Sequence, residues 1–142
     1  MSEEDIMEYL RRENHPNLFV HSNGLIYSNG SDKAVTWMNS TANGRPVINR
    51  TGYIVEFNAL WYNALRFTAD LLGEKGQTVL TEDLTELADK TGKSFVDVFL
   101  NEYGYLLDYV DGNMMDWSVR PNMIFAAAFD YSPLDARQKK GV

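Results

Sequence analysis

The sequence predicts a mainly α-helical protein in which antiparallel helical hairpins are joined by long irregular loops and accompanied by a short β-hairpin. The first observation is a helical pattern that begins at about Phe57 and carries two adjacent apolar stripes. Both stripes are expected to be buried between neighbouring helices, and they consist of Leu60, Ala64, Phe67 and Leu71, and of Trp61, Leu65, Thr68 and Leu72. The second is a further helical pattern, which runs through Leu84, Leu87, Thr91, Phe95 and Val98. A short turn at residues 73–76 separates the two patterns, so the helices are expected to pair antiparallel, as in helical bundles and helical toroids.

The chain is expected to begin with a short helix. Ser2 is a suitable N-cap and Asp5 its capping-box partner, and Pro16 lies beyond the expected end. The inward-facing residues of this helix are expected to be Ile6, Tyr9 and Leu10. Residues 17–38 then contain Asn-Gly turn signals at Asn23 and Asn29 between short apolar runs, which predicts an irregular loop or a short hairpin.

The central helix is expected to stop at Gly73, and Thr81 is expected to cap the next one. Gly92 interrupts that second pattern without ending it. Tyr105, Leu107 and Tyr109 alternate with their neighbours, which predicts a short strand closed by a turn at residues 111–113. Pro121 is a good first position for a last helix through MIFAAAF, and Ser132-Pro133 starts a new turn.

Composition limits the classes of function. The chain has 142 residues and a formal charge of −7, with 20 acidic and 13 basic residues and no cysteine. It contains no basic cluster that could release phosphate counterions, so nucleic acid and anionic membranes are not expected partners, whereas a neutral polysaccharide is compatible. The acidic N-terminus and the lack of a long apolar run predict a cytoplasmic protein without a signal peptide or membrane span.

No metal or cofactor is expected. His15 and His21, the only histidines, have no partner at the spacing of metal ligands, and structural or surface roles are favoured for both. An acidic group could suggest calcium, but its spacing lacks the register of an EF-hand loop, and we interpret it as a turn. This group consists of Asp108, Asp111, Asn113 and Asp116.

The junction of the loop at residues 33–56 with the central helix is the candidate site. It mixes aromatic faces with carboxylate, amide and guanidinium groups, in Trp37, Glu56, Asn58, Trp61, Tyr62 and Arg66. A sugar ring offers an apolar C–H face on which an indole can lie and a rim of hydroxyls that need directional hydrogen bonds. In the alternative interpretation, Trp61 and Tyr62 are core or rim aromatics and Glu56 is a solvated residue in the first helical turn.

Three segments resemble a known family. They read TWMNS, then NGRPVINRTGYIVEFNALWYNALR, then SVRPNMIFAAAFDYSPLD, and together they cover most of the chain, from about His21 to Asp135. They are similar to the glucosidase domain of glycogen debranching enzymes, the amylo-alpha-1,6-glucosidase type. The resemblance implies an (α/α)6 toroid of twelve helices in six hairpins. The chain has room for about a third of such a ring, so residues 1–142 are interpreted as a single partial domain.

The resemblance also implies site residues. The aspartate of the family's TWMD segment, implied to be the general acid, is Asn39 here, and a carboxamide cannot deliver a proton to a glycosidic oxygen. Glu56 is an alternative proton donor, because burial beside Trp37 or Trp61 would raise its pKa. The base that activates water is expected beyond Val142. The expected substrate-binding residues are Trp37, Glu56, Asn58, Trp61, Arg120 and Asn122, with pairing to Asp116 as the other interpretation of Arg120.

Three functional hypotheses follow. The leading one is a fragment of a glycogen-debranching glucosidase domain of the inverting kind, which retains part of a glucan pocket but is inactive alone. The second is a non-catalytic carbohydrate-binding or structural helical module, which Asn39 favours. The third is an interaction domain whose exposed apolar helix faces are covered by self-association.

Overall fold

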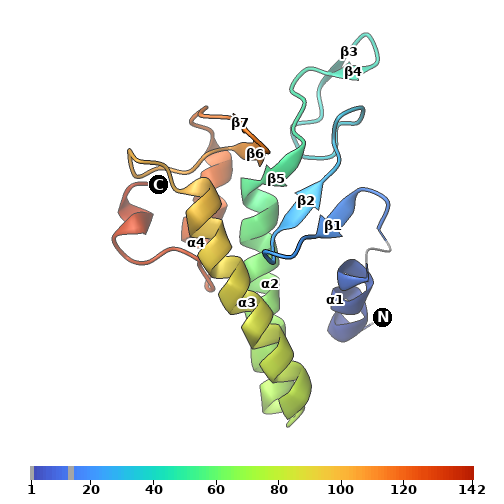
Figure 1. Ribbon diagram of the computed structural model, residues 1–142, viewed down its shortest axis with the longest axis vertical. Coiled ribbons are helices and arrows are strands. Elements are labelled where there is room, and N and C mark those ends of the chain that lie inside the picture. The colour runs from blue at the N-terminus through green and yellow to red at the C-terminus, as the bar shows by residue number, and fades with distance from the viewer. Residues whose placement is uncertain (1, 13–14) are drawn as a thin grey trace.

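The computed structural model describes residues 2–12 and 15–142, and its central feature is a long antiparallel helical hairpin with a sheet across one end (Figure 1). The hairpin consists of α2 (Val55–Glu74) and α3 (Thr78–Phe99). The sheet joins β1 (Leu18–Val20), β2 (Ile26–Ser28), β5 (Gly52–Ile54), β6 (Tyr109–Asp111) and β7 (Met114–Met115). The coarse prediction of a mainly helical chain around a helical hairpin is therefore confirmed, whereas the sheet is larger than the short β-hairpin that was expected.

Helix α1 (Glu3–Arg11) begins with the predicted capping box. The Ser2 hydroxyl accepts a hydrogen bond from the Asp5 backbone N–H, and the Asp5 carboxylate accepts one from the Ser2 backbone N–H. The prediction of inward-facing residues was wrong for Ile6 and Tyr9, which are exposed. Met7 is buried instead, because α1 turns its Met7 side toward the apolar cluster around Trp61.

The five-stranded sheet has the order β1-β2-β5-β6-β7, and all its neighbouring strands are antiparallel. β1 and β2 form the hairpin that the first Asn-Gly signal predicted. β6 begins at Tyr109 rather than at Tyr105, because Leu106 and Leu107 bond back to the end of α3, where Leu107 donates to the Phe99 carbonyl. The turn predicted at residues 111–113 is confirmed, since it joins β6 to β7.

Strand β5 was missed because it is only three residues long and runs directly into α2. Its first residue, Gly52, has a φ of +96°. A β-carbon at Gly52 would lie 2.3 Å from the carbonyl oxygen of Val110 on the neighbouring strand. Only glycine combines this backbone conformation with so close an approach of two strands. A separate two-stranded ribbon, β3 (Thr41–Ala42) with β4 (Arg45–Pro46), extends from the loop before β5.

One of the two predicted stripes on α2 is buried. Trp61, Leu65, Thr68 and Leu72 pack inward as expected. The other stripe was predicted to be buried as well, but Leu60 and Phe67 are exposed and Ala64 and Leu71 are half-buried. We call these four residues the open stripe of α2. The helix also continues through Gly73 to Glu74, and the chain reverses at Gly76, which has a φ of +74°.

Helix α3 begins three residues before the expected cap. Thr81 therefore lies inside the helix, where its hydroxyl donates to the Gln77 carbonyl. Leu84, Thr91 and Phe95 are buried as predicted, and Ala88 and Phe99 complete the face. Gly92 continues the helix as expected, and it allows α3 to approach α2, because a β-carbon there would lie 2.8 Å from the Tyr62 ring.

The C-terminal part begins at Pro121 as predicted, with the 3-10 turn η1 (Pro121–Met123) followed by the five-residue helix α4 (Ile124–Ala128). A second 3-10 turn, η2 (Gln138–Lys140), lies near the C-terminus. Met123 and Ala126 join the core cluster that contains Phe95 and Phe99.

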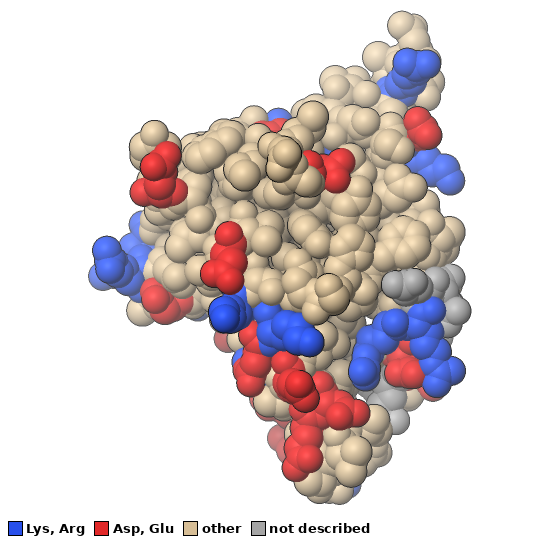
Figure 2. Space-filling view, viewed as in Figure 1, with Lys and Arg blue, Asp and Glu red and all other residues tan. Residues whose placement is uncertain are grey.

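Acidic side chains gather over the outer face of α3 (Figure 2). The exposed acidic residues of this helix are Glu82, Asp83, Glu86, Asp89 and Asp97. Within residues 2–12 and 15–142, no helix is both long enough and apolar enough to cross a membrane.

Candidate functional site

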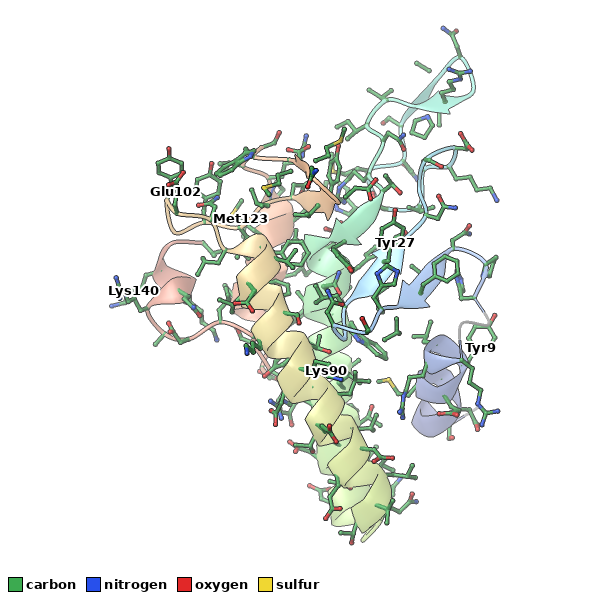
Figure 3. All side chains as sticks on the ribbon, in the orientation of Figure 1. Tyr9, Tyr27, Lys90, Glu102, Met123 and Lys140 are labelled. Carbon is green, nitrogen blue, oxygen red and sulfur yellow. The ribbon has the colours of Figure 1, made fainter. Side chains whose placement is uncertain are left out.

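Four segments meet at the end of the hairpin where the sheet crosses it. They are the first turn of α2, the segment that leads into β6, η1, and the loop around Trp37. The N-terminal end of α2 lies between Tyr27 on the sheet side and Met123 on the α4 side, both labelled in Figure 3. Polar side chains that are buried in this region connect the four segments.

Arg50 is the centre of a buried ion-pair cluster. Its Nη1 and Nη2 atoms donate to the two oxygens of Glu56 at 2.5 and 2.7 Å. Its Nε and Nη2 atoms donate to the Asp108 carboxylate at 3.0 and 3.1 Å. A guanidinium presents donors in a rigid plane, so one arginine can hold two carboxylates in this paired geometry.

The cluster is electrostatically matched. Burial lowers the pKa of Arg50, but hydrogen bonds and charge from Glu56 and Asp108 raise it by more, so the net shift is upward. Glu56 lies in the first turn of α2, where the helix dipole favours negative charge. The Asp108 carbonyl accepts from the Val55 N–H, one of the donors that the start of a helix leaves without an intrahelical partner.

Asp108 extends the cluster toward η1. Its Oδ2 atom accepts from Arg120 Nη1 at 2.7 Å, and its Oδ1 atom accepts from Asn122 Nδ2 at 2.7 Å. Arg120 Nη1 also donates to Asp116 at 3.0 Å. The two interpretations of Arg120 are thus answered in part: it pairs with Asp116, and it lies next to the residues of the candidate site.

Charge pairing also shifts the pKa of Asp116. Burial raises it, but hydrogen bonds from Ser118 and the charge of Arg120 lower it by more, so the pKa of Asp116 lies below its ordinary value. For Arg120 the sign is opposite. Burial lowers its pKa, and Asp116 and Asp108 raise it by more.

Trp37 is the exposed part of the site. Its Nε1 atom donates to Asn122 Oδ1 at 2.9 Å, while 62% of the residue remains exposed to solvent. The Asn122 amide also contacts Met38 Sδ at 3.4 Å, so it holds two consecutive residues of the loop. Asn39 follows directly and is exposed. Beside Trp37 runs an open groove of about 620 Å³. Its walls are almost entirely apolar and include Pro121, Ile124, Phe125, Ala128 and Phe129.

The structure brings Trp37, Glu56, Arg120 and Asn122 together, but it places Asn58 and Trp61 elsewhere. Asn58 is fully buried, and its amide bonds to the backbone of Ile26 and Ile54. Trp61 is 3% exposed, and its Nε1 atom donates to the Gly24 carbonyl. Both residues face the β1–β2 side of α2, so they attach the sheet to the helix.

Tyr62 and Arg66 also lie outside the cluster. Arg66 donates to the Tyr62 hydroxyl at 3.1 Å and to the Asp89 carboxylate of α3 at 2.5 Å, near the protein surface. These residues connect the two helices of the hairpin. For Trp61 and Tyr62, the alternative interpretation as core or rim aromatics describes their surroundings better than the sugar-site interpretation. The same alternative was wrong for Glu56, which is buried rather than solvated.

The sequence reasoning did not include Arg50 and Asp108 among the site residues. Asp108 is a charged residue inside an apolar run, between Leu107 and the strand YVD, whereas Arg50 stands between Asn49 and Thr51, ahead of the strand GYI. Charged groups inside apolar runs are rarely buried unless they are paired. The position of Asp108 could therefore have indicated a buried carboxylate that needs a cationic partner, whereas the residues around Arg50 give no such signal.

Two members of the acidic group at residues 108–116, Asp108 and Asp116, belong to this ionic network. Asp108 and Asp116 bind arginines, and the Asp111 carboxylate accepts from the Tyr27 hydroxyl at 3.0 Å. In the part of the chain that the structure describes, no three histidine, cysteine or acidic side chains are grouped so that they could hold a metal ion.

Comparison with known proteins gives one family. The family model described as amylo-alpha-1,6-glucosidase matches residues 4–142, nearly the whole chain. Neither the curated proteins nor the solved structures contain a match. The matched range includes every residue of the ionic cluster and the Trp37 loop, and on this evidence the chain belongs to the amylo-alpha-1,6-glucosidase family.

Proposed function

We propose that this chain is part of a glycogen-debranching glucosidase domain, which acts on α-1,6 branch points of glycogen or limit dextrin, and that it supplies a glucan-binding surface at Trp37. One observation carries the proposal. An exposed indole is held by its N–H to a buried amide, two residues before the position where the family's acid is expected.

The chemistry of this surface suits a sugar. Once Asn122 has taken the indole N–H, the exposed indole surface can accept the C–H face of a glucose ring. Exposed polar side chains follow in the same loop, at Asn39 and Ser40, and can bind hydroxyls at the rim of the ring. The buried cluster holds the loop from below, which lowers the entropy that would be lost on binding.

We also propose that this chain binds glucan without hydrolysing it. An inverting glucosidase needs a carboxylic acid that protonates the leaving oxygen and a second carboxylate that activates water. At the acid position the chain has Asn39, which cannot donate a proton in this way. Glu56, the alternative donor, is buried with both oxygens bonded to Arg50, so its role in this proposal is to hold Arg50.

A toroid of helical hairpins would explain the open stripe of α2. Neighbouring hairpins in such a ring cover one another's apolar faces, and exposed Leu60 and Phe67 would be covered in this way. In the isolated chain we propose that the open stripe is covered by self-association.

The second candidate is a structural helical module without sugar binding. The groove beside Trp37 favours it, because almost all of its wall is apolar and includes Phe125 and Phe129. Such a groove fits another helix better than a polyhydroxylated ring. In this case Trp37 would pack against a protein segment.

Calorimetric titration with limit dextrin, together with an assay of released glucose, tests the proposal. We expect saturable binding without glucose release, and loss of binding in Trp37→Ala. The matched control is Trp117→Ala, which removes an exposed tryptophan that lies edge-on to Tyr103, outside the site. Absence of saturable binding by the unmodified chain would favour the structural module, and equal binding by both variants would contradict the role of Trp37. Glucose release by the unmodified chain would contradict the proposal that it cannot cleave.

A further inference from the structure

We propose that Asp108 is a positioning residue for Trp37, acting through the amide of Asn122. The consequence for binding rests on the proposed function: a carboxylate that does not touch the glucan sets the orientation of the indole that binds it. The positioning of Trp37 by Asp108 rests on the hydrogen-bond geometry alone.

The backbone of Asp108 is fixed from two sides. Its N–H donates to the Asp116 carbonyl at 2.9 Å, and its carbonyl accepts from the Val55 N–H at 3.1 Å. The side chain is 1% exposed and is held by two guanidinium groups, with Arg50 and Arg120 both on Oδ2 and Arg50 also on Oδ1. Asp108 is therefore a rigid acceptor at a defined place.

The Asn122 amide can connect Asp108 to Trp37 in only one orientation. An ionised carboxylate only accepts hydrogen bonds, and an indole N–H only donates. The NH2 group of Asn122 must therefore face Asp108, where the distance is 2.7 Å, and its oxygen must face Trp37, where the distance is 2.9 Å. The reversed amide would place oxygen against carboxylate and N–H against N–H.

This polarity makes the hydrogen-bond relay from Asp108 through Asn122 to Trp37 specific. Asn122 is 1% exposed, so water cannot easily replace a lost partner, and an unsatisfied group there would be costly. Loss of the Asp108 charge would allow the amide to reverse and release the indole N–H. The exposed face of Trp37 would then move, although no residue in contact with solvent has changed.

The indole N–H signals in a nitrogen-proton correlation spectrum of the ligand-free protein test this relay. The chain has 3 tryptophans, and Trp37→Phe identifies the signal of Trp37. Asp108→Asn is expected to shift that signal and to accelerate its exchange with water. Asp116→Asn is the matched control, because it removes a carboxylate from Arg120 but leaves Asp108, Asn122 and Trp37 in place, and it should leave the signal unchanged.

A second variant protects the test against unfolding. Asn122→Leu breaks the relay at its middle while Arg50 and Arg120 keep the Asp108 carboxylate, and it should change the Trp37 signal in the same way. If Asp108→Asn does not fold, the Asn122→Leu spectrum decides. A Trp37 signal that remains unchanged in folded Asp108→Asn, or in Asn122→Leu if Asp108→Asn does not fold, would overturn the proposal.

Isomaltose titrations separate this proposal from the proposed function. Asp108→Asn is expected to weaken binding about fivefold, the equivalent of one hydrogen bond, and to have no further effect in a Trp37→Phe background. The same loss in both backgrounds would mean that Asp108 acts by general destabilisation and would overturn positioning. Absence of binding by the unmodified protein would contradict the proposed function, while the ligand-free spectra still test the relay.

Discussion

Arg50 and Glu56 form a buried ion pair in which two guanidinium nitrogens meet two carboxylate oxygens at 2.5 and 2.7 Å. The pair joins the segment before β5 to the first turn of α2, and Asp108, in the segment that leads into β6, shares the same arginine. One side chain thus holds three segments together beneath the Trp37 loop, which makes Arg50 the first residue to test.

Arg50→Met should lower the free energy of unfolding by about 3–5 kcal/mol, because two carboxylates would stay buried without their shared cation. Urea denaturation measures the change. The control is Arg66→Met, whose partner Asp89 is mostly exposed, and it should cost only about 0–1 kcal/mol. Similar small losses in both variants would mean that the Glu56 and Asp108 carboxylates do not depend on Arg50.

Gly92→Ala should destabilise the protein, although alanine in a helix interior normally gains about 1 kcal/mol over glycine. The added β-carbon would lie 2.8 Å from Tyr62 Cε2, and Arg66 holds that ring at its hydroxyl. We expect a net loss of about 1 kcal/mol or more, measured by thermal denaturation. In a Tyr62→Ala background the same substitution should become stabilising, and a gain in both backgrounds would show that the ring moves aside without cost.

Asp116 should contribute stability that disappears in acid. Its pKa is lowered in the folded protein from an ordinary value of 3.8, so the folded state favours the ionised form. The contribution is complete above the unfolded pKa and is lost as the pH falls through the lower, folded pKa. Urea denaturation of the unmodified protein and Asp116→Asn should differ at about pH 6 and converge at about pH 2. A difference that grows toward acid would contradict the sign of this shift.

The open stripe of α2 should make the isolated protein associate with itself. Sedimentation equilibrium is expected to show a mass that rises with concentration, and Phe67→Gln should shift it toward the monomer because Phe67 is half exposed on this stripe. Val79→Gln, an exposed apolar residue of α3 outside the open stripe, should have no such effect. A monomeric mass for the unmodified protein at every concentration would contradict the proposed self-association.

The helical part of the fold could be predicted because its signals are local. The spacing of Leu65, Thr68 and Leu72, the capping box at Ser2 and the proline at residue 121 each describe a few neighbouring residues, and the structure confirms them. The sequence predictions were wrong where tertiary packing decides which face of a helix is buried. Leu60 and Phe67 have the right period for a buried face, but period alone does not say which elements are present to cover that face.

The site was predictable only in part. Trp37 was named from the mixture of aromatic and polar groups before the central helix, and Asn122 from the resemblance. Their contact joins residues that are 85 positions apart in the sequence, which no local pattern specifies. Trp61 has the same chemistry as Trp37 and lies at the expected junction, yet the β1–β2 hairpin covers it and takes its N–H. The difference between an exposed and a buried indole comes from strands that the sequence signalled only weakly.

The central claim is that Trp37 binds glucan, and the most direct measurement is a titration of the labelled protein with isomaltose, observed through its three indole N–H signals. The account predicts that the Trp37 signal shifts with saturation while those of buried Trp61 and of Trp117 stay in place. A saturating shift of the Trp117 or Trp61 signal with Trp37 unmoved, or no shift at any isomaltose concentration, would contradict it.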